Sequence, residues 1–131
     1  MDAESSRQRA GSFSAPPKQS REDILLSLAT QIDADGGLPG KTLELRAGLS
    51  AIAILAFISQ GHTLSQGAFR LHVARLVNFL KSVTGLSPEQ QRIIARTIET
   101  AERGAAPPAD WIRLARRPGK PWKELARVFT S

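Results

Sequence analysis

The sequence predicts an all-α fold, a compact bundle of five to six helices around a central apolar helix at about residues 42–60. Between the glycine and proline breaks, apolar residues recur at the three- and four-residue spacing of a helix face. The segment 47–58, AGLSAIAILAFI, is apolar on nearly every side, which is typical of a helix surrounded by other helices. Only the short stretch 41–46 alternates as a strand would, and it merges into the central helix.

Residues 1–20 are predicted to form a disordered tail or linker, and residues 21–131 a single helical domain. The first segment, MDAESSRQRAGSFSAPPKQS, has almost no apolar content beyond Met1 and Phe13. It therefore cannot bury enough surface to offset the entropy of ordering. The remaining ~110 residues are enough for one modest core.

Composition excludes several classes of site. The chain has no cysteine, which excludes disulfides and cysteine-based zinc sites. No apolar stretch follows the first residues, so we expect no secretory signal peptide in this chain, and the compartment stays unknown. The longest apolar run is about a dozen residues, whereas a membrane-spanning helix needs roughly 20. We therefore expect no membrane span.

The first helix is predicted to begin at Ser20, the expected N-cap, with Asp23 in its first turn. Its apolar face repeats at helical spacing and comprises Leu25, Leu28, Ala29 and Ile32. Gly36 and Gly37 should end this helix. The second, central helix runs from about residue 41 to residue 60, and Gly61 should follow its C-cap.

Two long helices and two short ones should follow. The third helix is predicted from about Ser65 to Lys81, and its apolar stripe comprises Phe69, Val73, Leu76, Val77 and Leu80. The fourth has the clearest boundaries, with Ser87 as N-cap, Pro88 at the first helical position and Gly104 at the end. The short helices, at about 108–116 and 122–129, are separated by the RPGKP break.

The net charge of +6 is concentrated near the C-terminus. Residues 110–131 carry basic side chains against only two acids, Asp110 and Glu124. The candidate partner or phosphate contacts are Arg113, Arg116, Arg117, Lys120, Lys123 and Arg127. A basic segment of this kind favours nucleic acid or another acidic partner. The alternative is an ordinary solvated helix surface.

The loop QIDADGGLPGK, residues 31–41, raises the question of a metal or phosphate site. Asp33, Asp35 and Glu44 fall at positions one, three and twelve of a calcium-loop pattern. However, position five is a glycine without a side-chain oxygen, and Leu38 stands where the pattern requires glycine. The phosphate-loop motif is also incomplete. We interpret the loop as a turn, with Asp35 and Gly36 as turn residues and no metal or cofactor.

The next connection, SQGHTLSQGAF, contains three further predicted turn residues, Gly61, His62 and Thr63. The other histidine, His72, lies ten residues later, outside the spacing of two ligands on one helix face. An enzyme site that combines His62 with Asp35 is the least favoured hypothesis. The two residues flank a central helix roughly 30 Å long at 1.5 Å per residue, so we expect no catalytic residue here.

The two tryptophans, Trp111 and Trp122, lie among arginines and lysines. Aromatic side chains among basic ones can stack on single-stranded nucleic acid. Both tryptophans are also spaced with leucine and alanine as on a packed helix face. We favour the packing interpretation.

Residues 24–80 carry a pattern of Gln31, then Ala-Asp-Gly at 34–36, a long apolar helix, Gly-His-Thr at 61–63 and a second amphipathic helix. This pattern resembles the C-terminal helical segment of bacterial proteins related to the inter-alpha-trypsin inhibitor heavy chains, which carry a VIT domain and a von Willebrand factor A domain upstream. It is also similar to the helical repeats of terpene cyclases and prenyltransferases. One departure is Leu38, where those repeats usually have an aromatic residue. The resemblance covers less than half of the chain.

The resemblance implies a non-enzymatic accessory or interaction domain within a larger protein. It also implies that any metal site of that protein lies in the upstream von Willebrand module. It also implies a fragment of an envelope or secreted bacterial protein. The first functional hypothesis is accordingly a protein-interaction or structural module with a protein partner. The alternative is a small basic nucleic-acid-binding protein that uses residues 110–131.

Overall fold

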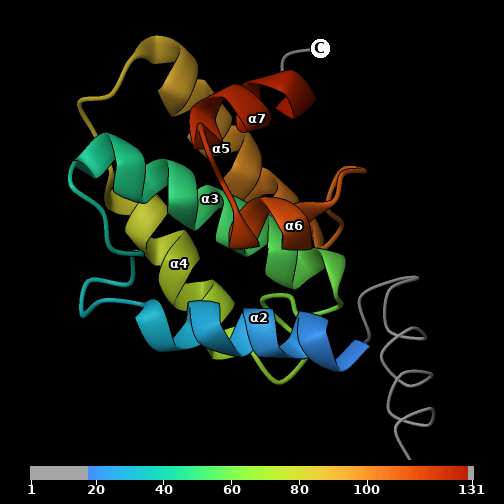
Figure 1. Ribbon diagram of the computed structural model, residues 1–131. Coiled ribbons are helices and arrows are strands. Elements are labelled where there is room, and N and C mark those ends of the chain that lie inside the picture. The colour runs from blue at the N-terminus through green and yellow to red at the C-terminus, as the bar shows by residue number, and fades with distance from the viewer. Residues whose placement is uncertain (1–17, 130–131) are drawn as a thin grey trace, which may run out of the picture.

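The computed structural model describes residues 18–129, and this part of the chain forms six helices and no strand (Figure 1). The helices are α2 (Lys18–Gln31), α3 (Leu43–Ser59), α4 (Arg70–Ser82), α5 (Pro88–Arg103), α6 (Trp111–Arg116) and α7 (Pro121–Phe129). The predicted all-α fold is confirmed. Of the tail predicted for residues 1–20, residues 18–20 belong to α2, so that part of the prediction is wrong, and residues 1–17 lie outside the described residues.

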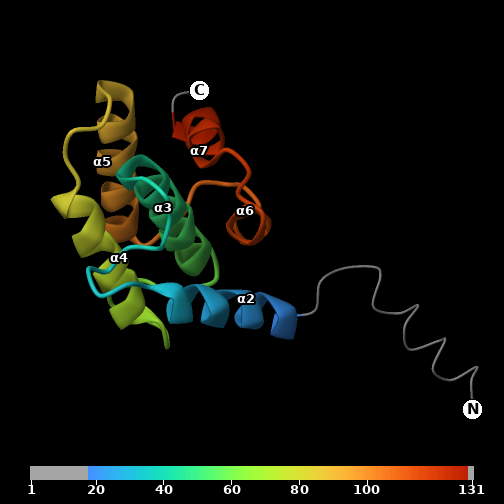
Figure 2. The same ribbon diagram turned by 60° about the vertical axis from the view of Figure 1, so that its left-hand side comes forward.

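The central position predicted for the second helix is confirmed, because α3 contacts each of the other five described helices. Figure 2 shows α3 with α4 and α5 on one side, α6 and α7 on the other, and α2 crossing below. Eleven of the 17 residues of α3 are buried, which is the consequence of its apolar character on every side. Its partners contribute large buried side chains, among them Leu25, Leu76, Ile93, Trp111 and Leu125.

Local capping explains why α3 and α5 have the boundaries that the sequence predicts. The Thr42 hydroxyl accepts a hydrogen bond from the Leu45 N–H (3.0 Å) at the start of α3. At its end, paired bonds from the N–H groups of Gly61 and His62 close a Schellman motif. A capping box formed by Ser87 and its partner at the third helical position starts α5, and a left-handed glycine ends it.

The start predicted for the first helix is wrong. Helix α2 already includes residues 18–20, so Ser20 lies inside the helix and is not its N-cap. Pro17 directly precedes this helix in the sequence, and proline is common at helix starts. The predicted end is also wrong, because α2 stops at Gln31 and the chain then turns through a bond from the Gly36 N–H to the Asp33 carbonyl (2.9 Å).

The start predicted for the third helix is wrong as well, since α4 begins at Arg70 and not near Ser65. Gly67 has a φ of +91°, which a helix cannot contain. The Thr63 hydroxyl also accepts bonds from the N–H groups of Ser65 and Gln66, which ties these residues into a turn. The predicted apolar stripe is confirmed for Val73, Leu76, Val77 and Leu80, which are buried on α4. Phe69 is only partly buried and lies at the N-cap position, outside the helix.

The two short helices cover α3. Helix α6 begins at Trp111, later than predicted, because Asp110 is its N-cap and accepts a bond from the Arg113 N–H (3.1 Å). Helix α7 is tied to α3 by a bond from the Trp122 indole to the Glu44 carbonyl (2.8 Å). The indole of Trp111 is buried and donates to the Pro107 carbonyl (2.7 Å). The packing interpretation of both tryptophans is therefore confirmed.

Candidate functional site

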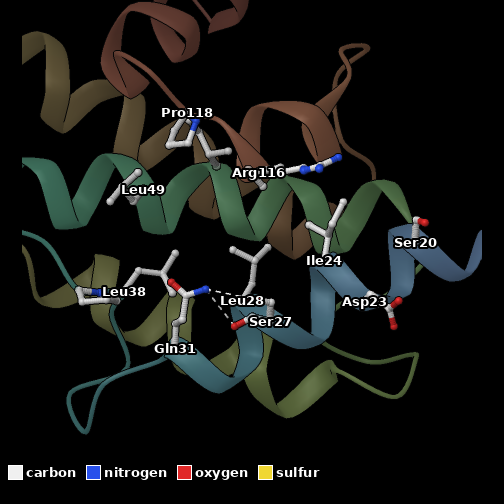
Figure 3. A pocket seen from close by; sticks show the side chains of 13 residues that line it. Ser20, Asp23, Ile24, Ser27, Leu28, Gln31, Leu38, Leu49, Arg116 and Pro118 are labelled. Atoms are coloured by element: carbon white, nitrogen blue, oxygen red, sulfur yellow. Dashed lines mark hydrogen bonds between the residues drawn. The ribbon is translucent and has the colours of Figure 1, made fainter. Parts of the chain in front are cut away.

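A groove of about 560 Å³ runs along one face of α2, between that helix, α3 and the end of α6 (Figure 3). Its walls carry side chains from each of these helices, from the loop before α3 and from the segment after α6. They are Ser20, Asp23, Ile24, Ser27, Leu28, Gln31, Leu38, Pro39, Leu49, Ile52, Ala115, Arg116 and Pro118. The α2 residues are three or four apart, which places them on one face of that helix.

The floor of the groove is apolar and partly open to solvent. Leu28, Leu38 and Ile52 are buried there, whereas Ile24 and Leu49 are only partly buried. The polar groups lie at the rim. Gln31 and Ser27 are hydrogen-bonded to each other, because the Gln31 side-chain amide donates to the Ser27 hydroxyl (3.1 Å; Figure 3).

Two charged side chains line the groove on opposite walls, Asp23 on α2 and Arg116 on α6. Within residues 18–129, neither side chain has an ion pair or a hydrogen bond. Figure 3 shows both at the end of the groove where α2 begins, with Leu38 toward the other end. An apolar floor with polar and charged groups at its rim is typical of a surface that receives a ligand.

All six predicted basic contacts are exposed on α6, α7 and the turn between them. Arg113 pairs with Asp110 (3.7 Å) and Arg127 with Glu124 (3.3 Å). Arg116 is the member of this set that lines the groove. Arg116 thus differs from the other five basic residues, because it lies beside the apolar floor of the groove.

The loop between α2 and α3 is held by Arg46, a residue of α3. Its guanidinium donates to both carboxylate oxygens of Asp35 (2.7 and 3.0 Å) and to Asp33 (3.3 Å), while its Nε donates to the Leu38 carbonyl (2.8 Å). The guanidinium also lies 4.9 Å from the centre of the Phe79 ring. Two of the three acids that suggested a metal loop, Asp33 and Asp35, therefore bind an arginine of the same chain.

The same loop contacts α4 closely. Arg75 donates to the Asp33 carbonyl (2.8 Å), and a Cβ atom on Gly36 would lie 2.5 Å from the Arg75 carbonyl oxygen. Gly36 has a φ of +92°, so glycine is required there for its backbone and for the space. Asp35 accepts from the Gly37 N–H (3.1 Å). Asp35 and Gly36 thus lie in a tight turn fixed to two helices.

Electrostatics at this turn follow from its hydrogen bonds. The Arg46 guanidinium holds the pKa of the Asp35 carboxyl below its usual value, and the Gly37 N–H adds to this effect. In return, the hydrogen bond with Asp35 raises the pKa of Arg46. Asp35 is therefore ionised at neutral pH and stabilises the turn as an anion.

The connection between α3 and α4 holds Gly61, His62 and Thr63, at the opposite end of α3 from Asp35. Both His62 and His72 contact the Phe69 ring edge to face, with ring centres 4.9 and 5.5 Å apart. The Nδ1 atoms of both histidines are buried without a hydrogen-bond partner in the described part of the chain. The histidines pack on Phe69, and the structure does not bring His62 and Asp35 together.

Three groups with clear structural or surface roles were missed by sequence reasoning. The sequence does not connect Arg46 with the aspartates, its apolar pattern includes Ser50 in the central helix, and nothing in it identifies the side of α2 that faces the groove. Ser50 is buried and accepts from the Leu38 N–H (3.0 Å). The only local signal was the row of polar residues at helical spacing on α2, from Ser20 to Gln31.

No group of three or more histidine or acidic side chains within residues 18–129 is placed to hold a metal ion. None of the helices described there combines the length and the apolar character that crossing a bilayer requires.

The chain matches no protein-family model, no curated protein and no solved structure. The resemblance of residues 24–80 to the C-terminal helical segment of VIT and von Willebrand factor A proteins stays a prediction.

Proposed function

We propose that the chain is a non-enzymatic protein-interaction module whose binding surface is the groove between α2, α3 and α6. The observation that carries this proposal is the combination of a partly open apolar floor with two unpaired charges, Asp23 and Arg116, on opposite walls. Protein interfaces commonly combine an apolar centre with a polar rim, and arginine is enriched among their key residues.

This role is also the one that the resemblance to VIT and von Willebrand factor A proteins implies. We therefore include in the proposal that the domain is one part of such a larger protein. Its binding surface would then serve contacts within that protein's assembly or with a separate partner.

The proposal is tested by filling the groove. Ser27 is exposed and lines the groove, whereas Thr30, also exposed on α2, does not. Ser27→Trp places an indole over the apolar floor, and Thr30→Trp adds the same indole to the same helix outside the groove. Tagged forms of both variants and of the unmodified chain are used to capture proteins from cell extract.

We expect the unmodified chain and Thr30→Trp to retain the same partner, and Ser27→Trp to lose it. Circular dichroism must show equal helix content in all three proteins. Equal retention by Ser27→Trp would contradict the proposal, because the indole would then occupy the proposed contact surface without effect.

A second candidate function is nucleic-acid binding through α6 and α7. It is favoured by the exposure of all six basic residues in this segment. Two of them form an ion pair with a nearby acid, Arg113 with Asp110 and Arg127 with Glu124. Phosphate contacts release counterions, so binding should weaken steeply with salt. An amide NMR titration with a short DNA duplex at low and moderate salt tests this candidate. Salt-insensitive spectra without shifts in residues 110–129 would exclude it.

A further inference from the structure

The walls of the groove favour a helical occupant over an extended one. Its walls are formed by α2, α3 and α6, by the turn before α3 and by Pro118 after α6, and no strand edge exists within residues 18–129. An extended peptide would find no strand edge to pair with, so those of its backbone N–H and C=O groups that face the apolar floor would lack partners, which is costly. A helix satisfies these groups internally and presents side chains alone.

The size of the groove fits about three turns of such a helix. Its α2 wall extends from Ser20 to Gln31. Eleven steps at 1.5 Å each give a length of about 17 Å, which is the length of about eleven helical residues. Apolar side chains at helical spacing on the occupant would cover Ile24 and Leu49, the two partly open residues of the floor.

The two sides of the groove differ in charge, and this difference predicts where the occupant carries its acidic residues. On the α6 side, Arg116 is unpaired, and it is followed by Arg117 and Lys120, which are also exposed. Asp110 is the only acid in residues 110–120 and already contacts Arg113 (3.7 Å). On the α2 side the charge that lines the groove is Asp23, which repels an acid. The occupant's acidic residues therefore belong on the flank that faces α6.

We infer that the groove binds an amphipathic helix of a partner protein, about three turns long, with its apolar stripe on Ile24 and Leu49 and an acidic flank against Arg116. This inference rests on the proposed function and deepens it by naming the class of partner.

The test uses two synthetic helical peptides of 14 residues as probes. Both carry the same leucines at helical spacing; one has glutamates along one flank, and the other has lysines at the same positions. Amide NMR spectra of the full chain are recorded during titration with each peptide. We expect shifts in α2, in α3 around Leu49 and at the end of α6, and binding of the acidic peptide about three- to tenfold tighter.

Charge reversal of the groove gives the specific control. Arg116→Glu should remove or invert the preference for the acidic peptide. Arg92→Glu changes the net charge by the same amount on α5, away from the groove, and should leave the preference intact. Both positions are exposed, so neither variant should impair folding.

The outcomes separate this inference from the proposed function. Preference for the acidic peptide, lost in Arg116→Glu alone, supports the inference. Equal binding of both peptides in the groove overturns the acidic flank but leaves the interaction module intact. Absence of groove shifts with either peptide overturns the helical occupant, while capture of a partner that Ser27→Trp abolishes would still sustain the proposed function.

Discussion

The contact between α7 and α3 depends on a single glycine, Gly48, and this dependence can be measured. A Cβ atom at Gly48 would lie 2.9 Å from Nε1 and 3.1 Å from Cε2 of Trp122, and 3.3 Å from the Cβ of Pro121. The same indole donates its N–H to the Glu44 carbonyl (2.8 Å). Gly48→Ala should therefore displace the indole and break this bond.

The size of the effect follows from opposing terms. Alanine is favoured over glycine inside a helix by about 1 kcal/mol. Overpacking typically costs about 1–3 kcal/mol, and loss of the Trp122 hydrogen bond costs about 1 kcal/mol. The net expectation for Gly48→Ala is a loss of about 1–3 kcal/mol in the free energy of unfolding. When Trp122 is replaced by alanine first, the Pro121 Cβ at 3.3 Å is the remaining close contact, and Gly48→Ala should then stabilise the protein by up to about 1 kcal/mol.

The assay is urea unfolding followed by circular dichroism, for the unmodified chain, both single variants and the double variant. The prediction is a change of sign for Gly48→Ala between the two backgrounds. If the substitution destabilised both backgrounds equally, Gly48 would be required by its own backbone and not by the indole. If it stabilised the unmodified chain, the indole would not lie where the structure places it.

Other substitutions test the loops. Ser50→Ala should lower the free energy of unfolding by about 1–3 kcal/mol in the same urea assay, because the buried Leu38 N–H loses its acceptor; an unchanged value would contradict this bond. Asp35→Asn should destabilise the protein at pH 7 but progressively less below about pH 4. The pKa of the Asp35 carboxyl is lowered in the folded state, so its charge stabilises the protein above the usual pKa of an aspartate, and this stabilisation is lost as the pH falls through the lowered pKa. A difference in unfolding free energy between the variant and the unmodified chain that stayed constant from pH 7 to pH 2 would refute the role of the charge. Gly67→Ala should cost more than Gly85→Ala, since both have positive φ but only Gly67 has His62 Nδ1 within 2.5 Å of an added Cβ; equal thermal shifts would remove the steric part of this explanation.

Much of the fold could be predicted because its signals are local. The cap at Ser87 and the glycine at Gly104 bound α5 within one residue, and the apolar character of residues 47–58 placed α3 at the centre. The start of α4 was missed because apolar periodicity continued through Phe69, while the Thr63 hydroxyl and the positive φ of Gly67 keep that stretch out of the helix. The hydrogen bonds and backbone conformation of this turn therefore decide where α4 begins, although the apolar periodicity extends further.

The candidate site could be predicted only in part. Arg116 was identified as one of six basic residues, but its position beside an apolar floor depends on α2 and α3, more than 50 residues earlier in the chain. The pairing of Arg46 with Asp33 and Asp35 likewise spans more than ten residues and depends on how the loop folds back on α3. Periodicity identifies the apolar face of each helix, but it does not show which polar faces meet.

The measurement that tests the central claim most directly is site-specific photo-cross-linking from the groove. A photoreactive benzoyl-phenylalanine replaces Ser27 in one variant and Thr30 in the other, and both proteins are irradiated in cell extract. The account predicts a protein cross-link from position 27, inside the groove, and none from position 30 on the same helix. Equal cross-links from both positions, or a cross-link from position 30 alone, would contradict the groove as the binding surface.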